Sequence, residues 1–126
     1  GTIGAFEGVM LDSDFIAAKP GQNYKLTVDV RAKGSPFVWI KGFQRHPRRG
    51  VFVDAYQTRL AAEDSSPDEW RTFSIGFNPT ARTPKVETFK VRLYAYWPNG
   101  IYHFDNVRVE EISEEEMSEL VRKREE

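Results

Sequence analysis

The stretch VETFKVRLYAYWPNGIYHFDNVRV, residues 86–109, decides the expected fold, because it places two strand-like runs around a Pro-Asn-Gly turn. The first run alternates between a small apolar set and a polar-aromatic set, Val91, Leu93 and Ala95 against Arg92, Tyr94 and Tyr96. A period of two puts these sets on opposite faces of a strand. The sequence therefore predicts a β-hairpin whose polar-aromatic face is a candidate binding surface.

The second run, residues 101–109, carries apolar groups on both faces. This pattern is typical of a strand that is partly buried on both sides. Asp105 is an ionisable group inside that apolar run. Because a buried charge needs compensation, we expect Asp105 to have either a hydrogen-bond partner or a cation.

Period-two patterns recur along the rest of the chain. They predict two short strands within residues 9–18, a half-buried strand at 24–32, a hairpin over 37–60 with a basic loop, and a strand at 70–77. Turn signals separate about eight such strands, and no helical period precedes residue 112. The predicted fold class is all-β, a β-sandwich of the jelly-roll type.

The C-terminal tail has a different pattern. Ser113 followed by Glu116 fits a capping box, and Met117, Leu120 and Val121 form a narrow apolar stripe at helical spacing. We therefore expect a β-sandwich domain over residues 1–112, followed at 113–126 by a short acidic α-helix or a linker.

Length and composition restrict the class of protein. The chain has 126 residues, 40% of them hydrophobic, which suits one domain with a real core. Residues 110–126 hold eight glutamates against three basic side chains, so the tail is acidic and the body mildly basic. Such a small basic excess does not indicate a nucleic-acid partner. No apolar run approaches the length of a membrane span, so no membrane insertion is expected.

Cysteine is absent, which excludes a disulfide framework, a thiolate zinc site and a cysteine nucleophile. The N-terminus lacks the layout of a signal peptide. Because the chain begins at Gly1-Thr2, directly ahead of strand-like sequence, we expect a fragment whose targeting signal is not included.

Three segments in order resemble a known family: IAAKPGQNYKLTVDVRAKG at 16–34, DEWRTFSIGFNP at 68–79 and VRLYAYWPNGIYHFDNVRVEEI at 91–112. They resemble the bacterial galactose-binding-like jelly rolls, in particular the carbohydrate-binding modules of families 4, 9, 16 and 22. In those modules a Pro-Gly turn precedes a central strand, a Trp opens a later strand, and F-D-D-V or F-D-N-V ends the domain. The N-terminal strand of the family is matched only faintly, at residues 4–8.

The resemblance implies a noncatalytic module of a larger secreted or cell-surface bacterial protein, which binds a carbohydrate polymer or oligosaccharide. It also implies a structural calcium ion held partly by Asp105. Calcium takes six to eight oxygen ligands, and the terminal strand supplies one obvious carboxylate. The remaining ligands are expected near the N-terminus, where the sequence departs most from the family.

Sugar binding requires an aromatic platform for the C–H face of a pyranose, with planar polar groups beside it for the hydroxyls. We expect one concave sheet to combine the face of Trp39, Lys41 and Phe43 with that of the first C-terminal run. The predicted ligand-binding residues are Trp39, Tyr94, Tyr96, Arg92, Arg31 and Asp29. The alternative is that Trp39 and Phe43 belong to the core and that the polar residues are merely solvated.

Other candidates are open to two interpretations. Trp70 opens a strand and is either structural or a ligand contact, and Trp97 lies at a loop tip. The Arg45–Arg49 cluster either contacts an anionic polymer or is a solvated hairpin tip. His46 and His103 lack a third group at ligand spacing, which disfavours zinc.

Catalysis finds little support, because the nucleophile elbow, the phosphate-cradling loop and the His-x-x-x-His pair are all missing from the sequence. The predicted function is noncatalytic recognition of a poly- or oligosaccharide through an aromatic-lined groove. The alternative is a structural or protein-interaction β-sandwich module without sugar binding, because one fold hosts many functions.

Overall fold

The structure is a computed structural model that describes residues 4–6, 10–34, 36–63, 65–94 and 102–125. Its elements are β1 (Gly4–Phe6), β2 (Met10–Asp12), β3 (Ile16–Ala17), β4 (Asn23–Ala32), β5 (Phe37–Arg45), β6 (Phe52–Ala61), β7 (Arg71–Phe77), β8 (Val86–Tyr94), β9 (Tyr102–Ile112) and α1 (Glu114–Glu125). The predicted β-sandwich with a short C-terminal helix is confirmed.

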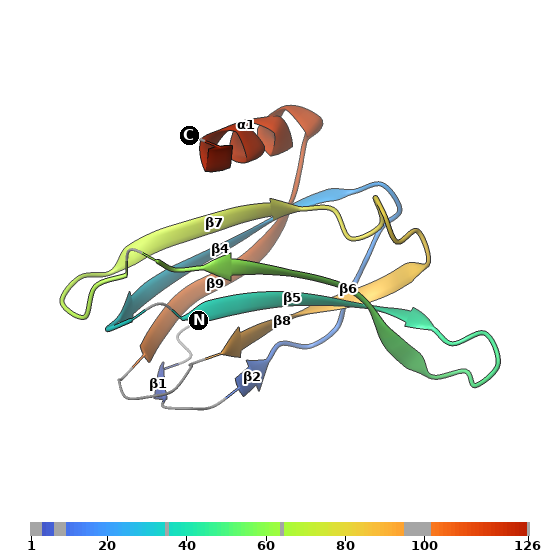
Figure 1. Ribbon diagram of the computed structural model, residues 1–126, viewed down its shortest axis with the longest axis horizontal. Helices are drawn as coiled ribbons and strands as arrows, with labels where there is room; N and C mark the ends of the chain where they lie inside the picture. Colours follow the sequence, from blue (N-terminus) through green and yellow to red (C-terminus); the bar gives the residue numbers. More distant parts are fainter. Residues whose placement is uncertain (1–3, 7–9, 35, 64, 95–101, 126) are drawn as a thin grey trace.

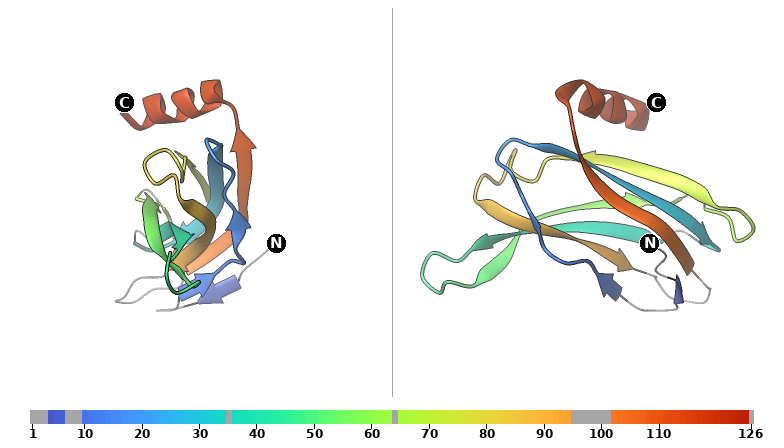
Figure 2. Two further views of the ribbon diagram at one scale, coloured as in Figure 1. Left: turned by 90° about the vertical axis from the view of Figure 1, so that its right-hand side faces the viewer. Right: turned by 180° about the vertical axis from the view of Figure 1, so that it is seen from behind.

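Two antiparallel sheets face each other (Figures 1 and 2). Sheet A has the strand order β1-β9-β4-β7, and sheet B has the order β2-β8-β5-β6, with β3 also paired to β8. Consecutive strands therefore often belong to different sheets. The chain passes from sheet A to sheet B between β4 and β5, and it returns between β6 and β7.

The core lies between the sheets and follows the predicted period of two. In β4, Leu26, Val28 and Val30 are completely buried. Asp29 and Arg31, which alternate with the valines, are only partly buried. Phe89 of β8 and Phe104 of β9 are the largest fully buried side chains. The strands β4, β5 and β8 thus contribute one apolar face to the core and leave the other outside.

The predicted hairpin over residues 37–60 is confirmed, because β5 and β6 pair antiparallel from Phe37 opposite Ala61 to Arg45 opposite Phe52. The register shifts between Gly42 and Phe43. A Cβ atom added at Gly42 would lie 2.9 Å from Tyr56 Cβ and 3.2 Å from a methyl group of Val86. Glycine is therefore required where these strands approach most closely.

The predicted hairpin within residues 86–109 is wrong. β8 pairs with β5, β2 and β3 in sheet B, whereas β9 pairs with β4 and β1 in sheet A. The two strands each bury one apolar face, and those faces meet across the core instead of lying side by side. The Pro-Asn-Gly segment falls within residues 95–101, outside the described part of the chain.

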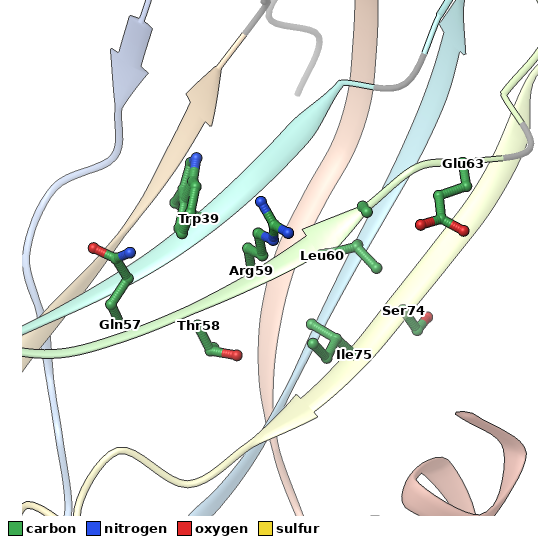
Figure 3. Close-up of a pocket in the computed structure, with 9 residues that line it drawn as sticks. Trp39, Gln57, Thr58, Arg59, Leu60, Glu63, Ser74 and Ile75 are labelled. Carbon is green, nitrogen blue, oxygen red and sulfur yellow. The ribbon is translucent and has the colours of Figure 1, made fainter. Parts of the chain in front are cut away.

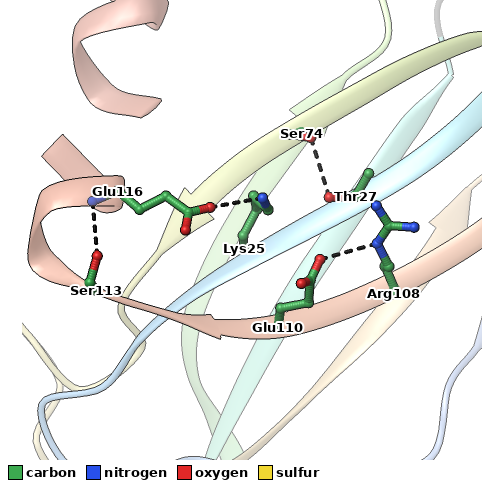
Figure 4. Close-up of polar contacts among 7 residues, drawn as sticks. All are labelled: Lys25, Thr27, Ser74, Arg108, Glu110, Ser113 and Glu116. Carbon is green, nitrogen blue, oxygen red and sulfur yellow. Dashed lines mark hydrogen bonds and ion pairs between the residues drawn. The ribbon is translucent and has the colours of Figure 1, made fainter. Parts of the chain in front are cut away.

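Helix α1 packs on the outer face of sheet A. The predicted cap is present, since the Glu116 amide donates to Ser113 Oγ at 3.2 Å (Figure 4). Lys25 of β4 pairs with the Glu116 carboxylate at 2.8 Å. Above Gly76 of β7, a Cβ would approach Met117 Sδ to 2.7 Å, so glycine lets the helix lie directly on the strand. The division at residue 112 remains a prediction.

In the part of the chain that the structure describes, no helix is long and apolar enough to cross a membrane.

We predict that Gly42→Ala destabilises the protein by about 1–3 kcal/mol, because the added methyl group overpacks a rigid contact between strands. The midpoint of urea unfolding, followed by tryptophan fluorescence, measures the change. Gln57→Ala on the exposed side of β6 is the matched control and should leave the midpoint almost unchanged. Equal midpoints for Gly42→Ala and the wild type would contradict the close approach at this position.

Candidate functional site

The outer face of sheet B brings Trp39 together with basic side chains from both neighbouring strands. Val38 and Ile40 point into the core, so Trp39 and Lys41 point outward. Trp39 lies opposite Arg92 of β8 on one side and Arg59 of β6 on the other. Because paired positions in adjacent strands are close neighbours, the three form one row across the sheet.

Arg59 lies over the aromatic rings of this row. Its guanidinium carbon is 4.6 Å from the ring centroid of Phe37 and 5.5 Å from that of Trp39. These are cation–π distances, which hold the planar guanidinium against the rings. Any ligand that stacks on Trp39 therefore meets a positioned hydrogen-bond donor as well.

A second aromatic group lies further along the same face. The exposed Phe15 ring contacts Phe43 edge-on at 5.6 Å and Phe52 in a stacked arrangement at 6.5 Å. Lys90 Nζ is 5.4 Å from the Phe15 and Phe43 centroids, and the Arg45 guanidinium carbon is 5.2 Å from that of Phe52. The outer face of sheet B thus combines aromatic rings with cations along its length.

A groove of about 760 Å³ runs beside β6, the edge strand of this sheet (Figure 3). Its lining residues come from β5, β6, β7 and the segment between β6 and β7: Trp39, Gln57, Thr58, Arg59, Leu60, Ala61, Glu63, Ser74 and Ile75. The volume is within the range of small-ligand sites. Trp39 and Arg59 therefore border a hollow large enough for a sugar unit.

The structure tests the predicted binding residues Tyr94 and Tyr96 only in part. The backbone of Tyr94 pairs with Phe37 at the end of β8, next to the row of Trp39. Its side chain lies outside the described part of the structure, as do Tyr96 and Trp97. Their roles in binding stay predictions.

The expected position of Asp29 and Arg31 beside Trp39 is wrong. Both belong to β4, which pairs with β7 and β9 in sheet A. Their side chains point outward from that sheet, because they alternate along β4 with Val28 and Val30, which point into the core. The predicted site is therefore divided between the two outer faces of the sandwich, and a ligand role for Asp29 and Arg31 stays a prediction.

Asp29 accepts two hydrogen bonds on the outer face of sheet A. Thr72 Oγ1 donates to Oδ1 at 2.6 Å, and Asn106 Nδ2 donates to Oδ2 at 2.7 Å. These bonds, Asn106 first and Thr72 second, hold the pKa of Asp29 below its ordinary value. Asp29 is therefore ionised at neutral pH.

Asp105 lies directly opposite Asp29 in the pairing of β4 with β9 and is partly exposed. Its Oδ1 accepts a hydrogen bond from the Asn106 amide at 2.8 Å. Within the described residues, no group of three acidic, histidine or cysteine side chains gathers to hold a metal ion. Calcium ligation by Asp105 therefore stays a prediction.

The basic loop between β5 and β6 folds around His46, whose Nδ1 accepts the amide hydrogens of Arg48 and Arg49 at 3.1 and 3.2 Å. His103 lies in sheet A, paired with Arg31. The two histidines thus belong to different sheets.

Arg59, Gln57, Phe15 and Phe52 are among the residues of the outer face of sheet B that sequence reasoning missed. The sequence predicts a hairpin over residues 37–60, but the bulge at Gly42 hides which side chains of its second strand share the face of Trp39. One signal in the sequence could have identified Arg59. If the pairing is counted from the open end of the hairpin, where Phe37 lies opposite Ala61, the alternating residues Ala61, Arg59 and Gln57 share the face of Trp39.

Comparison with known proteins supports the fold. No family model matches the sequence, and no curated protein matches it. A solved structure described as "CBM4 structure and function" matches with a TM-score of 0.51 and 16% sequence identity, over 82% of this chain and 61% of that chain. This chain thus covers less than two thirds of that structure's length. The likeness shows a shared β-sandwich fold, as in carbohydrate-binding modules, and does not choose among families 4, 9, 16 and 22.

We predict that Asp29 contributes to stability in a pH-dependent manner. Because its pKa is lower in the folded protein than in the unfolded chain, the contribution is complete above a pH of about 3.9. It is lost as the pH falls from there through the folded pKa. Urea unfolding at a series of pH values should show the wild type losing its advantage over Asp29→Asn in acid, and a difference that is constant with pH would contradict this assignment.

Proposed function

We propose that this chain is a noncatalytic carbohydrate-binding module that holds a poly- or oligosaccharide on the outer face of sheet B and in the groove at its β6 edge. The observation that carries the proposal is the partly exposed Trp39, which borders a groove of about 760 Å³ together with Gln57 and Arg59. Such a combination of an indole ring with planar polar side chains suits a sugar, which has both C–H faces and hydroxyl edges. The fold shared with the CBM4 structure supports the same function.

The proposed binding mode follows from the row of Trp39. A pyranose ring places its C–H face against the indole, while Arg59 and Gln57 donate hydrogen bonds to its hydroxyl oxygens. Arg92, opposite Trp39 on β8, contacts the neighbouring part of the glycan. The contacts predicted from the sequence for Tyr94 and Tyr96 are part of the same proposal.

The proposal includes the setting that the family resemblance implies. The module belongs to a larger secreted or cell-surface protein of a bacterium, and other domains of that protein carry any catalytic activity. Its role is to keep the parent protein close to a carbohydrate polymer.

A structural or protein-interaction module is the second candidate, and one observation favours it. The Arg59 guanidinium lies over both Phe37 and Trp39, so a sugar must share these rings with a cation of the protein itself. Aromatic side chains and arginine are also the residues enriched in protein interfaces. Binding of glycans therefore decides between the two functions.

We predict that Trp39→Ala weakens glycan binding about tenfold or more, because aromatic contacts of this kind contribute on the order of 1 kcal/mol beyond the area they bury. Calorimetric titration with soluble glucan, xylan, galactan and pectin measures the affinity. Trp39→Phe is the matched variant and should retain part of it.

Two outcomes contradict the proposal. One is the absence of a response from wild-type protein to every glycan of the panel, which favours the interaction module. The other is unchanged affinity in Trp39→Ala, which moves the binding site away from the outer face of sheet B.

A further inference from the structure

A second set of aromatic and polar side chains lies on the outer face of sheet A, on the opposite side of the sandwich from Trp39. Helix α1 packs near Gly76 and Lys25, at the far end of β7 from Trp70 (Figures 1 and 2). The Trp70 end of the sheet is consequently open, and 45% of the Trp70 surface is exposed.

The first row of this set is formed by Trp70, Arg31 and His103. Arg31 of β4 pairs with His103 of β9, and Trp70 directly precedes Arg71, which pairs with Val30. The Arg31 guanidinium carbon is 5.2 Å from the Trp70 ring centroid. The His103 ring meets the indole edge-on at 6.2 Å. The indole is thus held in position by two neighbours while almost half of its surface remains accessible.

The second row consists of Thr72, Asp29 and Asp105, which are paired across β7, β4 and β9. The rows are two residues apart along β4, a distance of about 7 Å. This spacing suits one six-membered sugar ring with its hydroxyls. The first row supplies the stacking surface and cationic donors, and the second row supplies carboxylate acceptors.

Asn106 completes the second row through an uncommon backbone conformation. Its φ is 51°, the one positive value among the described non-glycine residues, and it lies where the pairing of β4 with β9 shifts register. Left-handed backbone is unfavourable for a non-glycine residue, although asparagine tolerates it best, and such residues are concentrated at functional sites. Here it brings Asn106 Nδ2 to 2.7 Å from Asp29 Oδ2, which fixes the carboxylate.

Arg31 adds a second feature that is unfavourable for the stability of the fold. Its Nε is buried, and no acceptor reaches it among the residues that the structure describes. A buried donor without a partner is unfavourable. The same side chain places its guanidinium carbon 5.2 Å from the ring centroid of the exposed Trp70, where a ligand that stacks on the indole meets it.

We propose that these two rows form a second carbohydrate site, which takes one neutral pyranose unit at the end of sheet A. The sugar stacks on Trp70, its hydroxyl oxygens accept hydrogen bonds from Arg31, and its hydroxyl hydrogens are donated to Asp29, whose oxygens retain acceptor capacity beside Thr72 and Asn106. Two carboxylates in the second row disfavour uronic acids and sulfated sugars. The site does not depend on glycan binding at Trp39.

The test maps binding residue by residue on the full chain. Cellohexaose, xylohexaose and mannohexaose are titrated into ¹⁵N-labelled wild type, Trp39→Ala and Trp70→Ala, with trigalacturonate as the anionic control. We expect a neutral sugar to shift the amide signals of Arg31, Thr72 and His103 in the wild type and in Trp39→Ala. Trp70→Ala should weaken this response about tenfold or more, and trigalacturonate should not produce it.

The outcomes separate this inference from the proposed function. Signals of the Trp70 and Asp29 rows that stay unchanged with all three neutral sugars overturn the second site, whatever happens around Trp39. An equal response in Trp70→Ala, or a stronger response to trigalacturonate than to the neutral sugars, also overturns it. Shifts confined to sheet A, with none near Trp39, support the second site and contradict the first.

Discussion

The contact among Tyr24, Phe77 and Phe89 joins the two sheets, and the rest of the structure depends on it. Tyr24 and Phe77 come from neighbouring strands of sheet A, and Phe89 comes from the middle of sheet B. Their ring centroids are 5.0–5.6 Å apart, with two edge-on pairs and one stacked pair. Aromatic contacts of this geometry add to the free energy of burial, so they favour one arrangement of the sheets. The fixed inner faces then determine which residues are outside.

The local structure was predictable from the sequence because it depends on short-range patterns. Alternating burial along β4 and the Ser113 cap of α1 each involve residues within one element, and both follow the predicted form. The sequence did not allow us to predict which strands belong to which sheet. This assignment depends on contacts between residues far apart in the chain, which period-two alternation does not encode.

The candidate site shows the same limit. Asp29 and Trp39 are close in sequence and both point outward, but Asp29 lies in β4 of sheet A and Trp39 in β5 of sheet B. A pattern of alternation identifies an outward residue without telling which outer face it occupies. The topology of the strands therefore separates Asp29 and Arg31 from Trp39. That these polar side chains point outward was already evident from the alternation in the sequence.

The two outer faces use the same chemical combination with opposite electrostatic surroundings. Each has a tryptophan with an arginine against its ring, Trp39 with Arg59 in sheet B and Trp70 with Arg31 in sheet A. In both arrangements the aromatic ring itself holds the guanidinium in position.

What differs is the next row of side chains along each sheet. In sheet B, Lys41 lies between Lys90 and Gln57, so the row beside Trp39 is basic. In sheet A, Asp29 lies between Thr72 and Asp105, so the row beside Trp70 is acidic. Because charged groups one row away act on a bound ligand at short range, we expect the two proposed sites to differ in their preference for charged sugars. The two proposed sugar sites thus share a stacking group and differ in the charges beside it, while α1 packs on the other end of sheet A.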